Sequence, residues 1–240
     1  MAGFLIIVPT FNEAETLVSF VEAVLQALPE AEVLVIDDAS PDGTGRLADE
    51  LAGRDARLHV LHRPAKLGLG TAYVAGFRWG LARSYERFCE MDADFSHDPS
   101  YLKAFVAELE WGADVVVGSR NVPGGAIEGW GPLRYLLSKG GSLYSRLVLG
   151  VAVRDLTTGF KAYTRHALET IGIDGISSNG YAFQIETTYR ALKNGLRVTE
   201  LPIVFVDRRA GKSKMSRHEV AEGVLGVWRM RRAQQQRRRG

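Results

Sequence analysis

The feature that most constrains this chain is the alternation of short apolar segments with longer amphipathic ones. Short, mostly apolar segments, of the kind that form buried strands, occur at 4–8, 32–36, 58–61, 87–91 and 114–117. Segments with apolar residues at helical spacing lie between them, at 13–28, 43–54, 70–85 and 99–112. This alternation predicts an α/β protein with a mostly parallel sheet that is covered by helices on both faces.

The second half of the chain is less regular. Residues 124–131 are glycine-rich and predict a loop, and residues 197–201 predict a strand. Helices are expected at 132–149, at 181–194 and from 216 onward. Because no linker is evident, we predict one domain over residues 1–228, with a nucleotide-binding half (1–120) and an acceptor-binding half (121–228).

The positive charge of the chain is concentrated at its carboxyl end. The formal net charge is +2, yet residues 229–240 contain six arginines and no acidic residue, so the rest of the chain is acidic. Such a basic tail is either solvated or attracted to an anionic lipid surface. The acidic body lacks a basic stripe, which argues against a nucleic-acid-binding protein.

Cysteine content and hydropathy indicate the compartment. Cys89 is the only cysteine, which excludes an intrachain disulfide and any site built on several cysteines, and it fits a reducing compartment. The first residues lack the basic segment and cleavage site of a signal peptide. The longest strongly apolar run, 4–8, is far shorter than the roughly 20 residues that cross a bilayer. We expect a cytoplasmic protein.

Polar clusters follow four of the predicted strands, at 9–13, 37–43, 92–94 and 118–120. In an open parallel sheet the carboxyl ends of the strands share one edge, and ligands bind there. We therefore expect Asp38, Asp94 and Arg120 to meet at that edge. Carboxylates packed closely repel one another, and they persist mainly where a cation or a polar ligand binds.

Asp92 and Asp94 are separated by one small residue and are suited to hold a single hard cation. Carboxylate oxygens favour Mg²⁺ or Mn²⁺, which usually completes its shell with water and substrate phosphates. The alternative is a loop with helix-capping aspartates. Asp37 and Asp38 likewise either form a turn before the next helix or hold the ribose or base of a nucleotide.

Other nucleotide-binding and nucleophile motifs are missing from the sequence. Residues 68–70 lack the third glycine of a dinucleotide-binding loop and follow the third strand instead of the first. The chain contains no Walker A motif and no recognisable nucleophile elbow. The missing Walker A motif argues against a P-loop ATPase.

With these residues in place, the chain resembles the family-2 glycosyltransferases of GT-A (Rossmann-like) fold. Among them it is most similar to the dolichol-phosphate (polyprenol-phosphate) mannose synthases. The likeness covers nearly the whole chain, and two stretches, DDASPDGT and LGLGTAY, are quite specific to this subgroup. The matching stretches are 8–17, 35–45, 66–77, 91–99, 116–120, 155–163, 180–186 and 205–215.

The resemblance implies the residues of the site. Asp94 and Arg120 would be catalytic, Asp92 and Asp94 would hold Mg²⁺ or Mn²⁺, and Arg120, Arg134 and Ser138 would bind the acceptor phosphate. Two departures are a phenylalanine at 11, where many members have tyrosine, and a serine at 96, where some have a glutamine metal ligand. The implied GDP-mannose site comprises Pro9, Phe11, Glu13, Ile36, Asp38, Asp92, Ala93, Asp94, Arg120, Arg208 and Lys214.

The reaction that the resemblance implies is an inverting transfer of mannose from GDP-mannose to a polyprenyl monophosphate. The product, a polyprenyl phosphate β-mannose, would serve as a lipid-linked donor for glycosylation. The second pKa of a phosphate monoester is near 6, so the acceptor is largely ionised at neutral pH. A hydroxyl acceptor would need a general base, and no base is evident in the sequence.

A lipid acceptor implies contact with a membrane surface or with a membrane-protein partner, and we expect a peripheral protein at the cytoplasmic face. The leucine-rich helix at 132–149 either packs on the core or rests against the membrane. A transferase of the same fold that uses UDP-glucose or another nucleotide sugar is the main alternative. A nucleotidyltransferase would need a glycine-rich basic loop after the first strand, which residues 8–13 do not provide.

Overall fold

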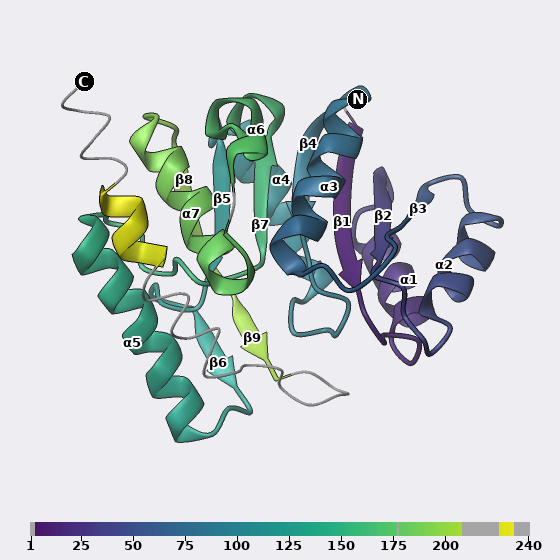
Figure 1. Ribbon diagram of the computed structural model, residues 1–240, viewed down its shortest axis with the longest axis horizontal. Coiled ribbons are helices and arrows are strands. Elements are labelled where there is room, and N and C mark those ends of the chain that lie inside the picture. The colour runs from purple at the N-terminus through teal and green to yellow at the C-terminus, as the bar shows by residue number, and fades with distance from the viewer. Residues whose placement is uncertain (1–2, 177, 208–225, 233–240) are drawn as a thin grey trace.

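The computed structural model describes residues 3–176, 178–207 and 226–232. Its centre is a seven-stranded sheet with the order β3-β2-β1-β4-β7-β5-β8 (Figure 1). All neighbouring pairs are parallel except the two that involve β7, which runs antiparallel to both β4 and β5. The strands are β1 (Gly3–Thr10), β2 (Ala31–Asp37), β3 (Leu58–His62), β4 (Tyr85–Glu90), β5 (Val115–Ser119), β7 (Lys161–Thr164) and β8 (Val198–Pro202).

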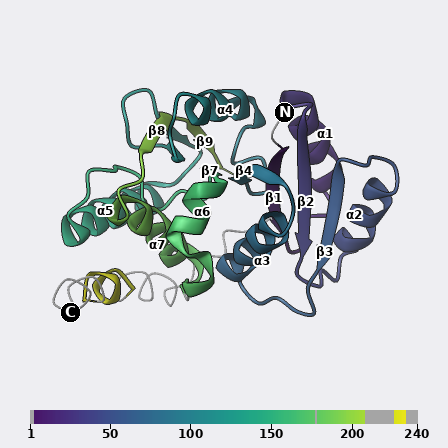
Figure 2. The same cartoon turned by 90° about the horizontal axis from the view of Figure 1, so that it is seen from above.

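Helices cover both faces of this sheet (Figure 2). Ile6 of β1 packs with α1 (Leu17–Ala27), α2 (Thr44–Ala52) and α4 (Leu102–Glu110) in one buried cluster. Its neighbour Ile7 packs in a second cluster with α3 (Leu69–Leu81), α6 (Arg165–Ile171) and α7 (Gly180–Lys193). Successive side chains of a strand point to opposite faces, so one strand serves both layers. The predicted mostly parallel, doubly covered sheet is confirmed.

The first helix begins four residues later than predicted, at Leu17, because the preceding residues form a turn. Asn12 has a positive φ of 61°, and its backbone N–H donates to Ser40 Oγ at 3.1 Å. The N–H of Glu13 donates to Thr44 Oγ1 at 3.0 Å. The loops that follow β1 and β2 are therefore tied together at the carboxyl edge of the sheet.

Residues 124–131, predicted to be a loop, contain a short strand. This strand, β6 (Ala126–Glu128), pairs in parallel with β9 (Val204–Val206) as a separate two-stranded sheet. After it comes α5 (Pro132–Leu149), which lies to one side of the two helical layers (Figures 1 and 2). Short 3₁₀ helices, η1 (Pro99–Tyr101) and η2 (Ile173–Gly175), complete the described elements before the carboxyl-terminal part.

Near the carboxyl end, residues 226–232 are helical, within the range predicted from 216 onward. Val227 of this helix is buried against Leu149 of α5 and Ile185 of α7 in a third apolar cluster. Among the described residues, no helix combines the length and the apolar character that a membrane span requires.

Candidate active site

The environment of His97 shows that the polar clusters after β4 and β5 meet. This imidazole is 1% exposed, and the charges of Asp92, Asp94, Arg120 and Asp155 all act on it. Burial lowers the pKa of His97, and the nearby carboxylates oppose that shift only in part. Its Nδ1 accepts the backbone N–H of Asp92 at 3.2 Å. Asp94 and Arg120 are therefore both close enough to act on this imidazole, as expected, and the meeting of Asp38 with them stays a prediction.

Asp92 and Asp94 follow β4 directly, at the end of a strand in the middle of the sheet. Tyr73 on α3 donates its hydroxyl to Asp92 Oδ1 at 3.1 Å, and the Asp92 side chain is 36% exposed. Asp94 is buried, and its Oδ1 accepts both the backbone N–H and the hydroxyl of Ser96. Phe95 has a positive φ of 60°, so the chain turns sharply after Asp94.

This pair of carboxylates fits a hard divalent cation that takes its remaining ligands from substrate and water. Oxygen donors suit Mg²⁺ and Mn²⁺, and Mg²⁺ typically uses one or two protein carboxylates together with substrate phosphates. Within the described ranges, no group of three or more His, Cys, Asp or Glu side chains is arranged to hold a metal ion. The residues therefore suit a cation shared with a phosphate ligand better than a metal held by protein alone.

Arg120, at the end of β5, is 4% exposed and is held by Asp155. Its Nε and Nη2 donate to the two oxygens of Asp155 at 2.7 Å and 2.8 Å, and its backbone N–H donates to Oδ2. Burial lowers the pKa of Arg120, but the charge of Asp155, its hydrogen bonds and the nearby Tyr181 together outweigh burial and raise the pKa. The guanidinium is therefore charged and fixed, and its Nη1 makes no hydrogen bond within the described part of the chain.

Side chains of α5 and β8 hold the Arg120–Asp155 pair in place. Arg120 Nη2 also donates to Thr157 Oγ1, which lies 3.2 Å from Ser142 Oγ on α5. The carboxylate of Glu200 on β8 accepts the backbone N–H of Asp155 at 3.0 Å. Sequence reasoning missed Asp155, although it opens the DLTTGF stretch on which the family resemblance rests.

Arg134 and Ser138 lie one turn apart near the start of α5. Arg134 Nη1 donates to Asp207 Oδ1 at 2.8 Å, and the guanidinium carbon lies 4.1 Å from the centroid of the Trp130 ring. Ser138 is half-buried. The roles of these two residues in acceptor binding stay predictions, as do the roles of Arg208 and Lys214, which lie outside the described residues.

On the nucleotide side, the carboxylate of Asp38 is paired with Arg63. The two ion-pair contacts measure 2.5 Å and 2.6 Å, and both side chains are buried. Asp38 Oδ2 also accepts the N–H of Leu67, so the pair orders the loop after β3. Sequence reasoning missed Arg63, although the rule that polar residues follow strands, applied to the third strand, would have found it.

The other predicted nucleotide residues differ in how they are placed. The Ile36 side chain is buried in the core against α3, so only its backbone faces the loops. Phe11 is half-buried and lies 4.3 Å from the Nζ of Lys66, measured to its ring centroid. Pro9 is half-buried at the end of β1, Glu13 lies in the turn tied to Thr44, and Ala93 is buried.

A buried polar cluster lies next to Asp92 and was also missed. Lys161 of β7 donates to Gln184 Oε1 at 2.8 Å, so the amide nitrogen of Gln184 points away from Lys161. Burial raises the pKa of Glu90, beside Lys161 in the sheet, to about 7, and burial lowers the pKa of Lys161 to about 8. A Cβ on Gly159 would lie 3.6 Å from Gln184 Nε2 and 3.8 Å from Asp92 Oδ2.

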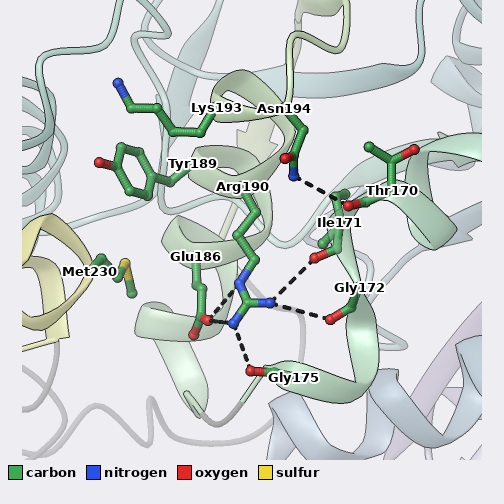
Figure 3. Close-up of a pocket in the computed structure, with 10 residues that line it drawn as sticks. All are labelled: Thr170, Ile171, Gly172, Gly175, Glu186, Tyr189, Arg190, Lys193, Asn194 and Met230. Atoms are coloured by element: carbon green, nitrogen blue, oxygen red, sulfur yellow. Dashed lines mark hydrogen bonds and ion pairs between the residues drawn. The ribbon is translucent and has the colours of Figure 1, made fainter. Parts of the chain in front are cut away.

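A cavity of about 490 Å³ lies away from this site, between α6 and α7 (Figure 3). The guanidinium of Arg190 crosses it and is fully used: it pairs with Glu186 and donates to the carbonyls of Ile171, Gly172 and Gly175. None of the lining residues belongs to the predicted site. We interpret the cavity as part of the packing between α6 and α7.

Comparison with known proteins gives consistent results. The model of the family described as glycosyl transferase family 2 matches residues 5–172. The polyprenol monophosphomannose synthase of Mycolicibacterium smegmatis is 50% identical over 93% of this chain and 84% of its own length. The undecaprenyl-phosphate mannosyltransferase of Micrococcus luteus is 49% identical over 94% of this chain and 92% of its own.

Solved structures share the fold at low sequence identity. A glucosyl-3-phosphoglycerate synthase from Mycobacterium tuberculosis, in complex with Mn²⁺ and UDP, has a TM-score of 0.67 at 20% identity and covers 96% of this chain and 80% of its own. The mannosyltransferase PcManGT from Pyrobaculum calidifontis, in complex with GDP-Man and Mn²⁺, has a TM-score of 0.58 at 22% identity. The match covers 96% of this chain and 61% of the PcManGT chain. The predicted GT-A fold is thereby confirmed.

Proposed function

Because the chain belongs to glycosyl transferase family 2 and is a glycosyltransferase, we propose that it transfers mannose from GDP-mannose to a polyprenyl monophosphate. The names of two relatives, each about half identical over more than nine-tenths of this chain, support this choice of sugar and acceptor. One structural observation carries the proposal: the charges of two carboxylates (Asp92 and Asp94) and of a fixed guanidinium (Arg120) all act on the same buried imidazole, that of His97.

In this proposal the donor diphosphate lies over Asp92 and Asp94, and Arg120 lies beside its leaving oxygen. A divalent cation, Mg²⁺ or Mn²⁺, held by the two aspartates would neutralise the charge that develops on the leaving GDP. Arg120 is fixed in advance by Asp155, so it needs no reorganisation to stabilise that charge. On the nucleotide side, Asp38 would act together with Arg63 to shape the loop that surrounds the guanosine.

The chemistry of the acceptor explains why the site needs no general base. A phosphate monoester is largely ionised at neutral pH, so its oxygen attacks the anomeric carbon directly. The nearest histidine, His97, is poorly suited to take a proton, because its Nδ1 accepts a backbone N–H and burial lowers its pKa. One displacement opposite the leaving diphosphate inverts the anomeric centre and gives a β-mannosyl phosphate.

The surface of α5 supports contact with a membrane that supplies the lipid. Several of its leucines are exposed, among them Leu136 at 68% and Leu147 at 72%, whereas Leu149 at its end is buried. Its buried side instead contains Ser142 and Ser145. A helix with outward leucines beside Arg134 is suited to lie at a lipid–water boundary, and this favours the membrane interpretation over a core-facing helix.

We therefore propose that the enzyme is peripheral at the cytoplasmic face of a membrane. The arginines near the carboxyl end would add attraction to anionic lipid, at about 1 kcal/mol for each basic residue near the surface. A membrane-protein partner covering α5 is the alternative explanation for the same exposed leucines.

The test is a transfer assay with purified full-length protein. We expect incubation with GDP-mannose, MgCl₂ and farnesyl phosphate to give a lipid whose mass increases by one hexose. UDP-glucose at the same concentration should give no such product and should compete poorly. Transfer from UDP-glucose and not from GDP-mannose would replace the proposed donor. If sugar is transferred from neither donor, to the lipid or to water, the proposed function is rejected.

A further inference from the structure

Trp130 contacts both of the arginines that the family resemblance assigns to the acceptor phosphate, Arg120 and Arg134. It precedes α5 closely and follows β6. The guanidinium carbons of Arg120 and Arg134 lie 5.8 Å and 4.1 Å from the centroid of its ring. Because both distances share one centroid, the two cations are no more than about 10 Å apart. They belong to different elements and are 14 positions apart in the sequence.

The Trp130 ring is held from the side by Phe205 of β9. The two rings meet edge to face with centroids 5.2 Å apart. Phe205 in turn contacts the His97 ring at 5.5 Å and lies 5.4 Å from the Arg120 guanidinium. Trp130 is therefore connected through one aromatic side chain to the imidazole that lies next to Asp92.

Two like charges held this close repel each other, and the site contains groups that offset this repulsion. Asp155 pairs with Arg120, and Asp207 pairs with Arg134. The negative face of the indole ring attracts both guanidinium groups, and it does so without using any of their N–H donors. Trp130 therefore keeps the two cations close together while leaving donors available for an anion.

The indole N–H itself is an unused donor. Trp130 Nε1 is buried and, among the described residues, has no hydrogen-bond partner. An indole nitrogen can only donate, and a buried donor without an acceptor is costly. An anion bound between the two arginines would supply that acceptor.

We propose that Trp130 completes the acceptor-phosphate site: its ring positions Arg120 and Arg134, and its N–H donates a hydrogen bond to the phosphate that they bind. The proposal rests on the proposed function for the identity of that phosphate as the lipid acceptor. Binding of a phosphate monoester at this place does not depend on sugar transfer, so the two can be tested separately.

The first test follows the indole N–H signals of ¹⁵N-labelled full-length protein while farnesyl phosphate is added. We expect the Trp130 signal, assigned by its loss in Trp130→Phe, to move downfield and to saturate. The signals of Trp79, Trp111 and Trp228 should move much less. A Trp130 signal that stays in place while calorimetry records binding of the lipid phosphate would overturn the proposal.

The second test separates acceptor from donor binding in steady-state kinetics. Trp130→Phe keeps an aromatic face and loses the N–H, and should raise the KM for farnesyl phosphate about tenfold. Trp130→Leu also loses the face and should raise this KM further. The KM for GDP-mannose should stay within twofold in both variants, and Trp111→Leu, at an exposed position, should match the wild type.

Equal rises in the two KM values, or an unchanged acceptor KM in Trp130→Phe, would reject the role. If Trp130→Leu does not fold, Trp130→Phe and the titration of the wild type still decide the question. Wild-type protein that transfers no mannose but whose Trp130 signal responds to farnesyl phosphate would reject the proposed function and support the site. If the wild type transfers mannose but its Trp130 signal does not respond to farnesyl phosphate, the proposed function is supported and the role of Trp130 is rejected.

Discussion

Two helices with the same kind of sequence pattern, α1 and α5, face opposite ways. In α1 the apolar residues Leu17, Phe20 and Val24 are fully buried on the sheet. In α5 four leucines, Leu136, Leu137, Leu143 and Leu147, are exposed, and the buried positions near its middle are Ser142 and Ser145. Apolar spacing identifies the apolar face of a helix, but not whether that face meets the protein's own core or something outside it.

The charged residues show the same difference between the two halves. In the first half, the buried pair Asp38–Arg63 forms within the nucleotide-binding residues. Arg120 of the first half instead depends on Asp155 of the second half, and within the second half Arg134 depends on Asp207. The Asp38 loop is therefore held by a pair within its own half, whereas Arg120 and Arg134 rely on partners from the second half, which retains an exposed apolar surface on α5.

The largest expected effect is on the nucleotide side of this comparison. Asp94→Asn should lower kcat about a thousandfold, because the amide cannot neutralise a cation that supports the leaving diphosphate. The melting temperature should stay close to that of the wild type, because the amide oxygen can still accept from Ser96. Asp98→Asn, at the exposed cap of η1, is the matched control. A kcat within tenfold of wild type would remove Asp94 from the mechanism.

The next largest effect concerns the charge pair that joins the halves. Asp155→Asn should lower the free energy of unfolding by about 3–5 kcal/mol, because it leaves the buried Arg120 charge uncompensated. Urea titration measures this. Asp174→Asn removes the exposed partner of Arg78 and should cost under about 1 kcal/mol.

The loss of stability in Asp155→Asn should depend on pH. Burial would raise the pKa of Asp155, but Arg120 outweighs burial and holds it below the ordinary value of 3.8. Stabilisation by this carboxylate is therefore complete above pH 3.8 and is lost as the pH falls below that value. The difference in stability between wild type and Asp155→Asn should shrink over that acid range. A difference that is constant with pH would argue against the ion pair.

Serine substitutions test the opposite orientations of α1 and α5 directly. Val24→Ser should cost about 2–3 kcal/mol of stability, since it leaves a cavity and a buried hydroxyl. Leu147→Ser should change stability by less than about 0.5 kcal/mol, yet lower binding to anionic vesicles about tenfold. Unchanged vesicle binding in Leu147→Ser, with wild-type stability, would assign the exposed face to a protein partner instead of lipid.

The smallest effect is expected at Gly159, which lies next to Asp92. Its backbone conformation is ordinary, and a methyl group there would make normal contacts with Gln184 and His97, so Gly159→Ala should fold normally. The methyl would occupy space next to the carboxylate, and we expect kcat to fall several-fold with little change in stability. Full activity would show that substrate does not approach Asp92 from the side of Gly159.

Much of the fold could be predicted from sequence because strand and helix signals alternate so regularly in the first half. β7 could not be predicted, because its antiparallel direction depends on the strands that it pairs with. β6 is too short to be distinguished from a loop in the sequence. Asp92, Asp94 and Arg120 were found because they follow strands. Arg63 also follows a strand and could have been found by the same rule, whereas Asp155 was missed because it follows no strand and works by pairing with Arg120, far away in the sequence.

The central claim is that residues from both halves hold two phosphates at one edge of the sheet. The most direct measurement is the paramagnetic relaxation of the ³¹P signal of farnesyl phosphate by Mn²⁺, with GDP and full-length protein present. The account predicts strong relaxation with wild type and a marked decrease with Asp94→Asn, while farnesyl phosphate still binds. Equal relaxation with both proteins would place the cation and the lipid phosphate at separate sites and contradict the account.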